Sequence, residues 1–363
     1  MSALHLRGVV LPEGEQRDLW VDAQGSVRHD PDATTRREAE TVLDGGWLLP
    51  GLVDAHCHVG LDEHGGVDEA TTEAQAVADR DTGALLLRDA GVPVDTHWVD
   101  DRADLPRIIR AGRHIARSKR YLRNYGEEIE PEQLVAEVER QAARGDGWVK
   151  LVGDWIDRDA GDLTPCWPAD VAAAAIGRAH ELGVRVTAHC FGEQSVAELV
   201  AGGIDCVEHG TGVTDDVIAE MARRGTALVP TRVQLDNFPA YAARAGAKFP
   251  AYAAHMRDLH ARCDRVLGAA VEAGVPVYAG TDAGGVLPHG LIGREVLALH
   301  EQVGMPAGSA LGAASWAARS WLGRPALEEG APADLVAYDQ DPRADLRALA
   351  TPRLVVLRGR VVA

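Results

Sequence analysis

The sequence predicts an α/β protein, a (β/α)₈ TIM barrel joined to a small β-sandwich. Between residues 50 and 325, short β-like runs alternate with helical runs, as in WVKLV, DVAAAAIGRAHELG and VRVTAH. This alternation is typical of βαβ units and therefore of a parallel sheet. Enough units follow one another to close a barrel, and their span is near the roughly 250 residues typical of that fold.

Short strands precede and follow this region. The chain begins with LHLRGVVL, DLWVDAQGSVR and TVLDGGWLLP and ends with ADLVAYD and RLVVLRGRVVA, and Gly and Asp turn signals separate the early runs. We therefore expect residues 1–48 and 328–363 to form the β-sandwich and residues 49–327 to form the barrel.

The composition is that of an ordinary soluble globular protein, 46% hydrophobic and 25% charged. Aromatic residues make up only 5%, so Ala, Val and Leu must build most of the core. The five cysteines are odd in number, widely spaced and without a CxxC pair, which indicates free thiols in a reducing compartment. No secretory signal and no run of about 20 apolar residues is present, so we expect a cytoplasmic protein.

The balance of charge argues against two classes of partner. Lys and Arg number 37 and Asp and Glu number 55, which gives a formal net charge of -18. Such a surface repels phosphate backbones and anionic lipid, so we expect neither nucleic acid nor a membrane as partner. A small-molecule substrate is expected instead, and the sequence also allows a homo-oligomer.

The motif PGLVDAHCHVG places two histidines at the end of an apolar, strand-like run. Residues two apart on a strand point to the same face, so His56 and His58 can reach one metal ion. In a barrel, this end of the strand is where the chemistry takes place. A lone HxH motif is a weak signal, and the alternative is a pair of surface histidines.

Three later strands end in the same kind of residue: His189 in VRVTAHC, His209 in IDCVEHG and Asp282 in VPVYAGTDAGG. A single histidine at a strand end is more often a packing or hydrogen-bonding residue. Together with the first two, however, they place four imidazoles and one carboxylate on one rim. These ligand types suit Zn²⁺ or a similar divalent ion such as Mn²⁺, Fe²⁺ or Co²⁺.

Lys150, in the strand-like run WVKLV, is an unusual residue at such a position. An ammonium group that points into a barrel toward metal ions is repelled and desolvated, so it is expected to lose its proton. The alternative is a lysine paired with a carboxylate such as Asp154.

The chain resembles the amidohydrolase superfamily, specifically binuclear members related to imidazolonepropionase and to Xaa-Pro and Xaa-Arg dipeptidases. The segments that carry the resemblance are PGLVDAHCH, WVKLV, VTAHC, VEHGTG, AGTDAGG and LEEGAPADLVAYDQDPRADL, and they extend over nearly the whole chain. The order His-x-His, Lys, His, His, Asp is highly specific to these enzymes.

The resemblance implies two metal ions, for which we expect zinc. His56, His58 and Asp282 would hold the more buried ion, and His189 and His209 the more exposed one. Lys150 would react with CO₂ to give a carbamate that bridges both ions.

The implied reaction is hydrolysis of a carbon–nitrogen bond by a hydroxide that bridges the two ions. Zinc lowers the pKa of bound water from 15.7 to about 7, and the second ion polarises the carbonyl. Asp282 would act as the general base and then as the acid that protonates the leaving amine.

The sequence gives less information about substrate contacts. Related dipeptidases carry a TGGH-like turn after the third strand, and Tyr121 in RSKRYLRN stands where its histidine would be, as an oxyanion donor. Arg123, with its neighbour Arg120, is a candidate for binding a substrate carboxylate, or else part of a solvated basic loop. Trp155 either walls the pocket or packs in the core.

Two further residues are expected near the substrate. Thr231 ends the seventh strand, and His289 follows Asp282 on the rim. Three hypotheses for function remain open: an amide hydrolase that acts on a dipeptide-like compound, an N-acyl amino acid or a cyclic amide; an ester, lactone or phosphotriester hydrolase; and a non-catalytic scaffold. The complete ligand set makes the scaffold the weakest of the three.

Overall fold

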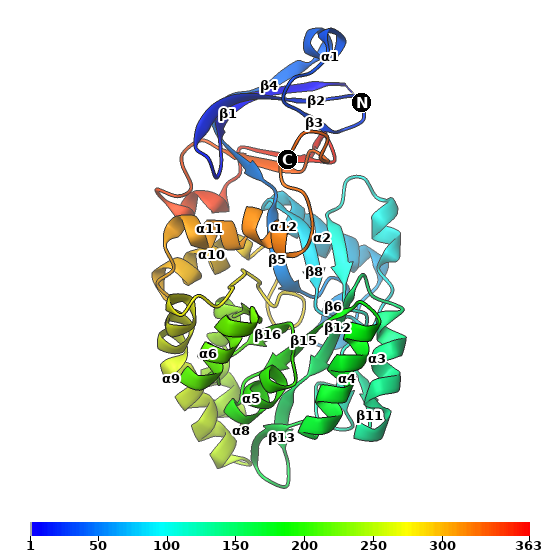
Figure 1. The fold of residues 1–363 in the computed structure, drawn as a ribbon, viewed down its shortest axis with the longest axis vertical. Helices are drawn as coiled ribbons and strands as arrows, with labels where there is room; N and C mark the ends of the chain where they lie inside the picture. The colour runs from blue at the N-terminus through cyan, green and yellow to red at the C-terminus, as the bar shows by residue number, and fades with distance from the viewer. Residues whose placement is uncertain (1) are drawn as a thin grey trace.

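The computed structural model describes residues 2–363. Figure 1 shows two regions along the long axis, a β-rich region that holds both termini and a larger region in which helices surround strands. The prediction of a mixed α/β fold is confirmed. None of the helices within residues 2–363 combines the length and the apolar character that a membrane crossing requires.

Both ends of the chain contribute to one sheet. Within residues 2–363 it has seven strands in the order β20-β19-β18-β4-β1-β2-β3. Their bounds are Leu4–Val10 (β1), Glu15–Val21 (β2), Val27–Arg28 (β3), Glu40–Pro50 (β4), Leu335–Tyr338 (β18), Leu354–Leu357 (β19) and Arg360–Val361 (β20). Strand β4 connects the two ends of the chain because it pairs in parallel with β1 and antiparallel with β18.

Alternating apolar residues explain why this sheet forms. Along β1 the buried positions recur at every second residue, which is the period that places side chains on one face of a strand. Leu6, Leu19, Leu48, Leu335 and Val356 belong to one apolar cluster on that sheet. Burying each such side chain contributes roughly 1.5–3 kcal/mol.

The larger region is built on parallel strands in two hydrogen-bonded sheets. Their orders are β5-β8-β9 and β11-β10-β12-β15-β16-β17, and every pair in them is parallel. The bounds are Leu52–Cys57 (β5), Ala84–Asp89 (β8), Arg107–Arg110 (β9), Ile115–Arg117 (β10), Glu127–Ile129 (β11), Trp148–Val152 (β12), Arg185–Cys190 (β15), Cys206–His209 (β16) and Ala227–Val229 (β17). Two small antiparallel pairs accompany them: β6 (Leu61–Asp62) with β7 (Gly65–Gly66), and β13 (Asp154–Asp157) with β14 (Asp162–Pro165).

Hydrogen bonds also join the two parallel sheets to each other. On one side, the backbone N of Asp146 donates to the carbonyl of Arg110 at the end of β9. On the other side, residues 276–283 run between β17 and β5. Leu228 N donates to Pro276 O on this segment, and Ala55 N donates to Ala279 O. The segment that carries Asp282 therefore lies beside the strand that carries His56.

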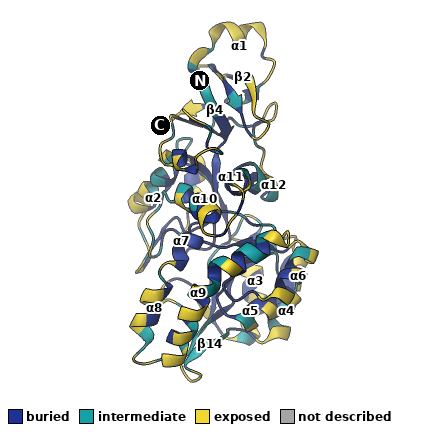
Figure 2. Ribbon diagram, turned by 90° about the vertical axis from the view of Figure 1, so that its left-hand side faces the viewer, coloured by how far each residue is buried: buried dark blue, intermediate teal, exposed yellow. Residues whose placement is uncertain are grey.

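Helices cover the strands and turn their buried faces inward (Figure 2). Their bounds are Ala33–Glu38 (α1), Glu69–Asp81 (α2), Leu134–Ala142 (α3), Ala169–Glu181 (α4), Glu193–Ala201 (α5), Asp215–Arg224 (α6), Arg232–Leu235 (α7), Phe238–Ala245 (α8), Pro250–Glu272 (α9), Ile292–Glu301 (α10), Ala307–Ala313 (α11) and Trp316–Trp321 (α12). In α6, Val217, Ile218 and Met221 recur at helical spacing and are buried. The helix begins with acidic residues, which favour the positive end of its dipole, and stops at Gly225, whose φ is 73°.

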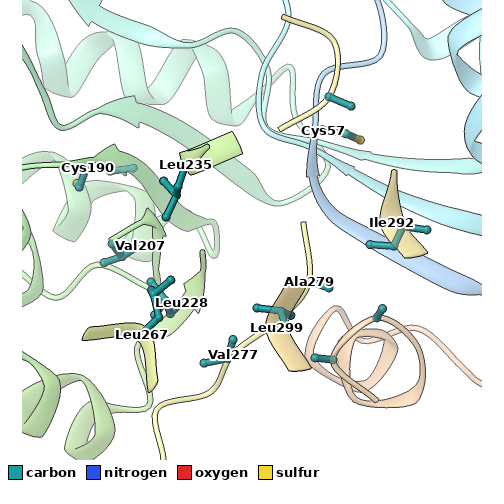
Figure 3. Packing of buried hydrophobic residues seen from close by; sticks show 14 of the residues in the cluster. Cys57, Cys190, Val207, Leu228, Leu235, Leu267, Val277, Ala279, Ile292 and Leu299 are labelled. Atoms are coloured by element: carbon teal, nitrogen blue, oxygen red, sulfur yellow. The ribbon is translucent and has the colours of Figure 1, made fainter. Parts of the chain in front are cut away.

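The main apolar core lies between the parallel strands and their helices (Figure 3). Val207 on β16 and Leu228 on β17 belong to it, together with Leu267 on α9 and Leu299 on α10. Ala, Val and Leu predominate among its members, as the low aromatic content predicted. Within residues 2–363, all five cysteines are buried and unpaired, which confirms the expected free thiols.

His255, on α9, connects that helix to two other elements. Its Nδ1 lies 3.0 Å from Asp162 Oδ1 on β14, and its Nε2 lies 3.0 Å from Glu193 Oε2 on α5. The hydrogen bond with Glu193 is the main cause that raises the pKa of His255 to about 9.

We expect His255→Gln to lower the free energy of unfolding by roughly 1–2 kcal/mol at about pH 6 and by almost nothing at about pH 10. The folded-state pKa lies above the unfolded value, so this stabilisation is complete below about pH 6.5 and is lost as the pH rises through 9. Urea unfolding of both proteins at the two pH values measures the effect. An equal loss at both pH values would contradict it.

Candidate metal centre

Two histidines at the end of β5 and the aspartate of the segment beside it meet at one point. Asp282 Oδ1 lies 3.1 Å from Nε2 of both His56 and His58, and the two Nε2 atoms are 3.3 Å apart. Ligand atoms of a tetrahedral zinc ion, at Zn–N distances of 2.0–2.1 Å, are separated by about 3.3 Å. These three side chains therefore have the spacing of a ligand set for one divalent ion.

A second pair of histidines lies next to this group. His189 Nδ1, on β15, is 3.0 Å from His209 Nε2, on β16. The ring of His209 is also 5.3 Å from that of His56, measured between centroids. The structure thus brings together all four histidines that the sequence singled out.

Lys150, on β12, is buried with no hydrogen-bond partner for its Nζ within the described residues. Burial lowers the pKa of this amine. Asp154, the alternative partner from the sequence, instead accepts backbone hydrogen bonds from Phe191 at 3.0 Å and Gly192 at 2.8 Å. A buried amine without a hydrogen-bond partner lowers the stability of the fold. Lys150 is therefore a candidate for bonding to a group that is not part of the chain.

Burial keeps most of the imidazoles neutral. Desolvation lowers the pKa of His58, lowers that of His189 further and brings that of His209 to about 3. Burial alone would also lower the pKa of His56, but the carboxylate of Glu208 raises it. A neutral imidazole keeps a free lone pair, which is what a metal ion requires.

Glu208 holds His56 from the side opposite the shared point. Its Oε2 lies 2.7 Å from His56 Nδ1, so that nitrogen donates and Nε2 keeps its lone pair. Arg88 donates to Glu208 Oε1 at 2.6 Å, and Thr187 contacts the same oxygen. Sequence reasoning missed Glu208, although an acidic residue inside the apolar run IDCVEH was a usable signal.

Arg88 and Asp89, consecutive residues at the end of β8, do not pair with each other. The side chain of Arg88 reaches Glu208 and the carbonyl of Ala55, whereas Asp89 accepts a hydrogen bond from the backbone N of Gly91. Neighbouring residues of a strand point to opposite faces, so the two side chains of β8 cannot meet.

Three residues at the site have left-handed backbone. φ is 65° at His209, 47° at Thr231 and 59° at Asp282. Such angles are uncommon for residues other than glycine and cost on the order of 1–3 kcal/mol each. At His209 the change from extended backbone lets two consecutive side chains both serve the site: Glu208 contacts His56, and His209 contacts His189.

Two polar contacts fix the remaining strand ends. Thr231 Oγ1 lies 2.7 Å from His209 Nδ1 and so orients the ring. Asp54 accepts hydrogen bonds from the backbone of His56 at 3.1 Å and of Thr281 at 3.0 Å, and from Thr281 Oγ1 at 2.5 Å. Asp54 therefore holds the first parallel strand against the segment that carries Asp282.

A cavity of about 480 Å³ opens onto these residues, and His58, His189 and Asp282 line it. Tyr121 and Trp155 also line it, with their ring centroids 4.8 Å apart. Burial raises the pKa of Tyr121 well above its usual value, so the phenol keeps the proton that it needs as a donor.

The predicted arginine contacts with substrate do not appear in this cavity. Arg123 is exposed and is not part of the lining. Arg120 is buried, where it donates to Asp157 at 2.9 Å and to the carbonyl of Trp155. One guanidinium is thus solvated and the other braces the β13–β14 hairpin.

Thr231 and His289 also lie outside the cavity lining. Thr231 is buried behind His209, which it orients. His289 turns toward α2, where its Nδ1 lies 2.7 Å from Asp79 Oδ2. His289 is therefore held against α2 and does not contribute to the cavity lining.

His114, just before β10, is a site residue that sequence reasoning missed. It is buried, its ring stacks on that of His58 at 5.0 Å between centroids, and its Nδ1 has no partner within the described residues. Burial lowers its pKa well below the usual value. The available signal was a histidine directly before the apolar pair Ile115 and Ala116, in a stretch that otherwise reads as a basic loop.

Comparison with known proteins identifies the family of the chain. The model of the amidohydrolase family matches residues 47–362. The chain is 58% identical over 358 residues to an uncharacterized protein of Mycobacterium tuberculosis strain H37Rv, covering 98% of this chain and 95% of that one.

Two solved structures share the fold. One is a Xaa-Pro dipeptidase with bound methionine, with a TM-score of 0.81 and 21% identity over 99% of both chains. The other is a putative prolidase from Bifidobacterium longum, with a TM-score of 0.81 and 24% identity over 99% of this chain and 94% of that one.

The chain therefore belongs to the amidohydrolase family. It is a hydrolase of the class that acts on carbon–nitrogen bonds. The family is metal-dependent in general, and the cluster of His56, His58 and Asp282 is a candidate metal site.

Replacing Thr231 by Val removes the hydroxyl that orients His209 and keeps the branched shape. We expect the affinity for zinc to fall roughly 10- to 100-fold, as when other outer partners of metal ligands are lost. Competition with a chromophoric chelator measures the affinity. Thr231→Ser keeps the hydroxyl and is the control, and wild-type affinity in Thr231→Val would show that the contact is irrelevant.

Proposed function

We propose that this protein is a binuclear metal-dependent hydrolase that cleaves an amide bond of a small molecule, such as a dipeptide-like compound, an N-acyl amino acid or a cyclic amide. One observation carries the proposal. Lys150 is buried without a partner, and its charge influences the pKa of His56, His189 and His209, which places it among the neutral imidazoles. Such a donor set is hard to explain without bound cations.

We also propose that residues 49–327 close into a (β/α)₈ barrel and that residues 1–48 and 328–363 form a β-sandwich beside it. Support for closure comes from the hydrogen bonds on both sides of residues 276–283. A barrel of parallel strands presents their carboxyl ends at one face, which is where such enzymes carry their active sites.

The residues present fit two divalent ions, and zinc suits their nitrogen and oxygen donors. His56, His58 and Asp282 would hold one ion, and His189 and His209 the other. The neutral amine of Lys150 would form a bond to the carbon of CO₂ and release one proton, which gives an anionic carbamate ligand. When bound, the ions supply Lewis acidity, which lowers the pKa of water and polarises a carbonyl oxygen.

The chain's own residues handle protons and charge. Asp282 turns Oδ1 toward the two histidines of β5, and its Oδ2 has no hydrogen bond within the described residues. Oδ2 is therefore placed to take a proton from the attacking water and to return it to the leaving amine. The Tyr121 hydroxyl lines the same cavity and donates a hydrogen bond to the developing oxyanion.

The proposal is tested with metal-replete protein and matched amide and ester substrates. We expect about two equivalents of divalent metal per chain, because two ligand groups are present. We also expect turnover of at least one class among dipeptides, N-acyl amino acids, and hydantoin-like or lactam rings. Esters, lactones and phosphotriesters are the second candidate class, since the same nucleophile attacks them without protonating an amine. Hydrolysis confined to those compounds would refute the amide assignment.

Asp282→Asn tests the proton transfer. We expect kcat to fall by roughly 10²–10⁴-fold because an amide cannot accept the proton, while the amide oxygen keeps part of the metal binding. Amide turnover and metal content are measured together on the same sample. Asp216→Asn, at an exposed position of α6, is the control, and near-wild-type turnover in Asp282→Asn would remove this residue from the mechanism.

A further inference from the structure

The outer wall of the cavity is rich in aromatic side chains. The chain has only six tyrosines, and four of them line this cavity: Tyr121, Tyr125, Tyr241 and Tyr252. They come from the loop after β10 and from helices α8 and α9, which are far apart in the sequence. Three of them, Tyr121, Tyr241 and Tyr252, also pack against the main apolar core, so the wall of the cavity is continuous with that core.

Further aromatic rings complete the same wall. Trp155 on β13, Phe191 after β15 and Phe249 before α9 also line the cavity. Trp155 and Tyr121 meet edge to face, with an interplanar angle of 69°. Aromatic faces in a concave site favour planar and apolar groups, through stacking and loss of hydrated surface.

Two cations stand on the same wall. Arg244, in the last turn of α8, and Lys248, just after it, both line the cavity and are exposed. Neither has a carboxylate partner within residues 2–363. Lys248 is one of three lysines in the chain, and its Nζ lies 5.1 Å from the ring centroid of Phe249.

Two cations without carboxylate partners are unusual in so acidic a protein. The protein has a formal net charge of -18, and its arginines are commonly paired with nearby acids. A pair of unpartnered cations four residues apart, at the mouth of an aromatic cavity, is suited to bind an anion. A guanidinium also binds a carboxylate through two parallel hydrogen bonds.

We propose that the substrate is an amide that carries both an aromatic group and a carboxylate. This inference rests on the proposed function and specifies its substrate class. The aromatic group packs against the tyrosines and Trp155, and Arg244 and Lys248 bind the carboxylate. The cavity of about 480 Å³ lies within the range that holds ligands of this size.

Three probe compounds test the aromatic group and the carboxylate of the substrate separately. N-benzoyl-L-phenylalanine has aromatic groups and a carboxylate, N-(2-phenylethyl)benzamide lacks only the carboxylate, and N-acetylglycine lacks the aromatic groups. We expect metal-replete wild-type protein to prefer the first probe over each of the others by roughly 10- to 100-fold in kcat/KM. One comparison removes a charge-assisted contact, and the other removes buried aromatic surface.

The double variant Arg244→Gln/Lys248→Gln tests the assignment of the carboxylate. We expect its preference for N-benzoyl-L-phenylalanine over N-(2-phenylethyl)benzamide to fall to roughly threefold or less, through a higher KM for the first probe. Turnover of the neutral probe should stay unchanged. Arg257→Gln, an exposed arginine of α9 outside the lining, is the matched control.

Failure of this inference and failure of the proposed function would give different results. Hydrolysis of amides without a preference for the first probe, or with a preference that the double variant keeps, overturns this inference and leaves the amide hydrolase intact. If no amide is turned over, the proposed function fails. Calorimetric binding of N-benzoyl-L-phenylalanine to metal-replete wild type and double variant then still measures the cation contact, and equal affinities overturn it.

Discussion

The burial of several metal-ligating side chains at one end of the parallel strands is the constraint on which the rest of the structure depends. Removing imidazoles, an amine and a carboxylate from water is unfavourable unless each is neutral, paired or hydrogen-bonded. Desolvation makes most of the imidazoles neutral, and Asp282 faces two of them. Two polar atoms of this group, Lys150 Nζ and His189 Nε2, have no hydrogen-bond partner within the described residues.

Polar groups behind the ligands hold this arrangement. The hydrogen bonds from Arg88 to Glu208 and from His56 to Glu208 fix which nitrogen of His56 carries the proton. The contact with Thr231 fixes the orientation of the His209 ring. The backbone is left-handed at His209, Thr231 and Asp282, and this conformational strain accompanies the placement of the ligands. The apolar core beneath, together with the helices around it, supplies the stability that tolerates such strain.

The parallel strands and the meeting of the ligand residues at their ends could be predicted from the sequence, because both follow from the spacing of apolar residues. Alternating strand-like and helical runs predict parallel strands, and parallel strands bring their carboxyl ends together, which is why residues as distant as His56 and Asp282 were expected to meet. Glu208 and His114 were missed for a different reason. Glu208 precedes His209, and ordinary strand alternation does not let two consecutive side chains serve one site; the left-handed backbone at His209 makes this possible. His114 lies in a stretch whose polar composition hides a buried position.

The substrate contacts were the least predictable part. The direction of a side chain on a loop depends on its tertiary neighbours, which the sequence does not show. In the structure, Arg120 contacts Asp157 and His289 contacts Asp79. Arg244 and Lys248, by contrast, look like ordinary helix-surface cations in the sequence. Only the folded chain shows that they line the same cavity as the aromatic residues.

Anomalous X-ray diffraction at the zinc edge, on crystals grown with zinc, tests the central claim most directly. Two peaks are predicted, one among His56, His58 and Asp282 and one at His189 and His209, with Lys150 between them carrying added density for a carbamate. A map without a peak at these residues, or with Lys150 turned away from them, would contradict the account.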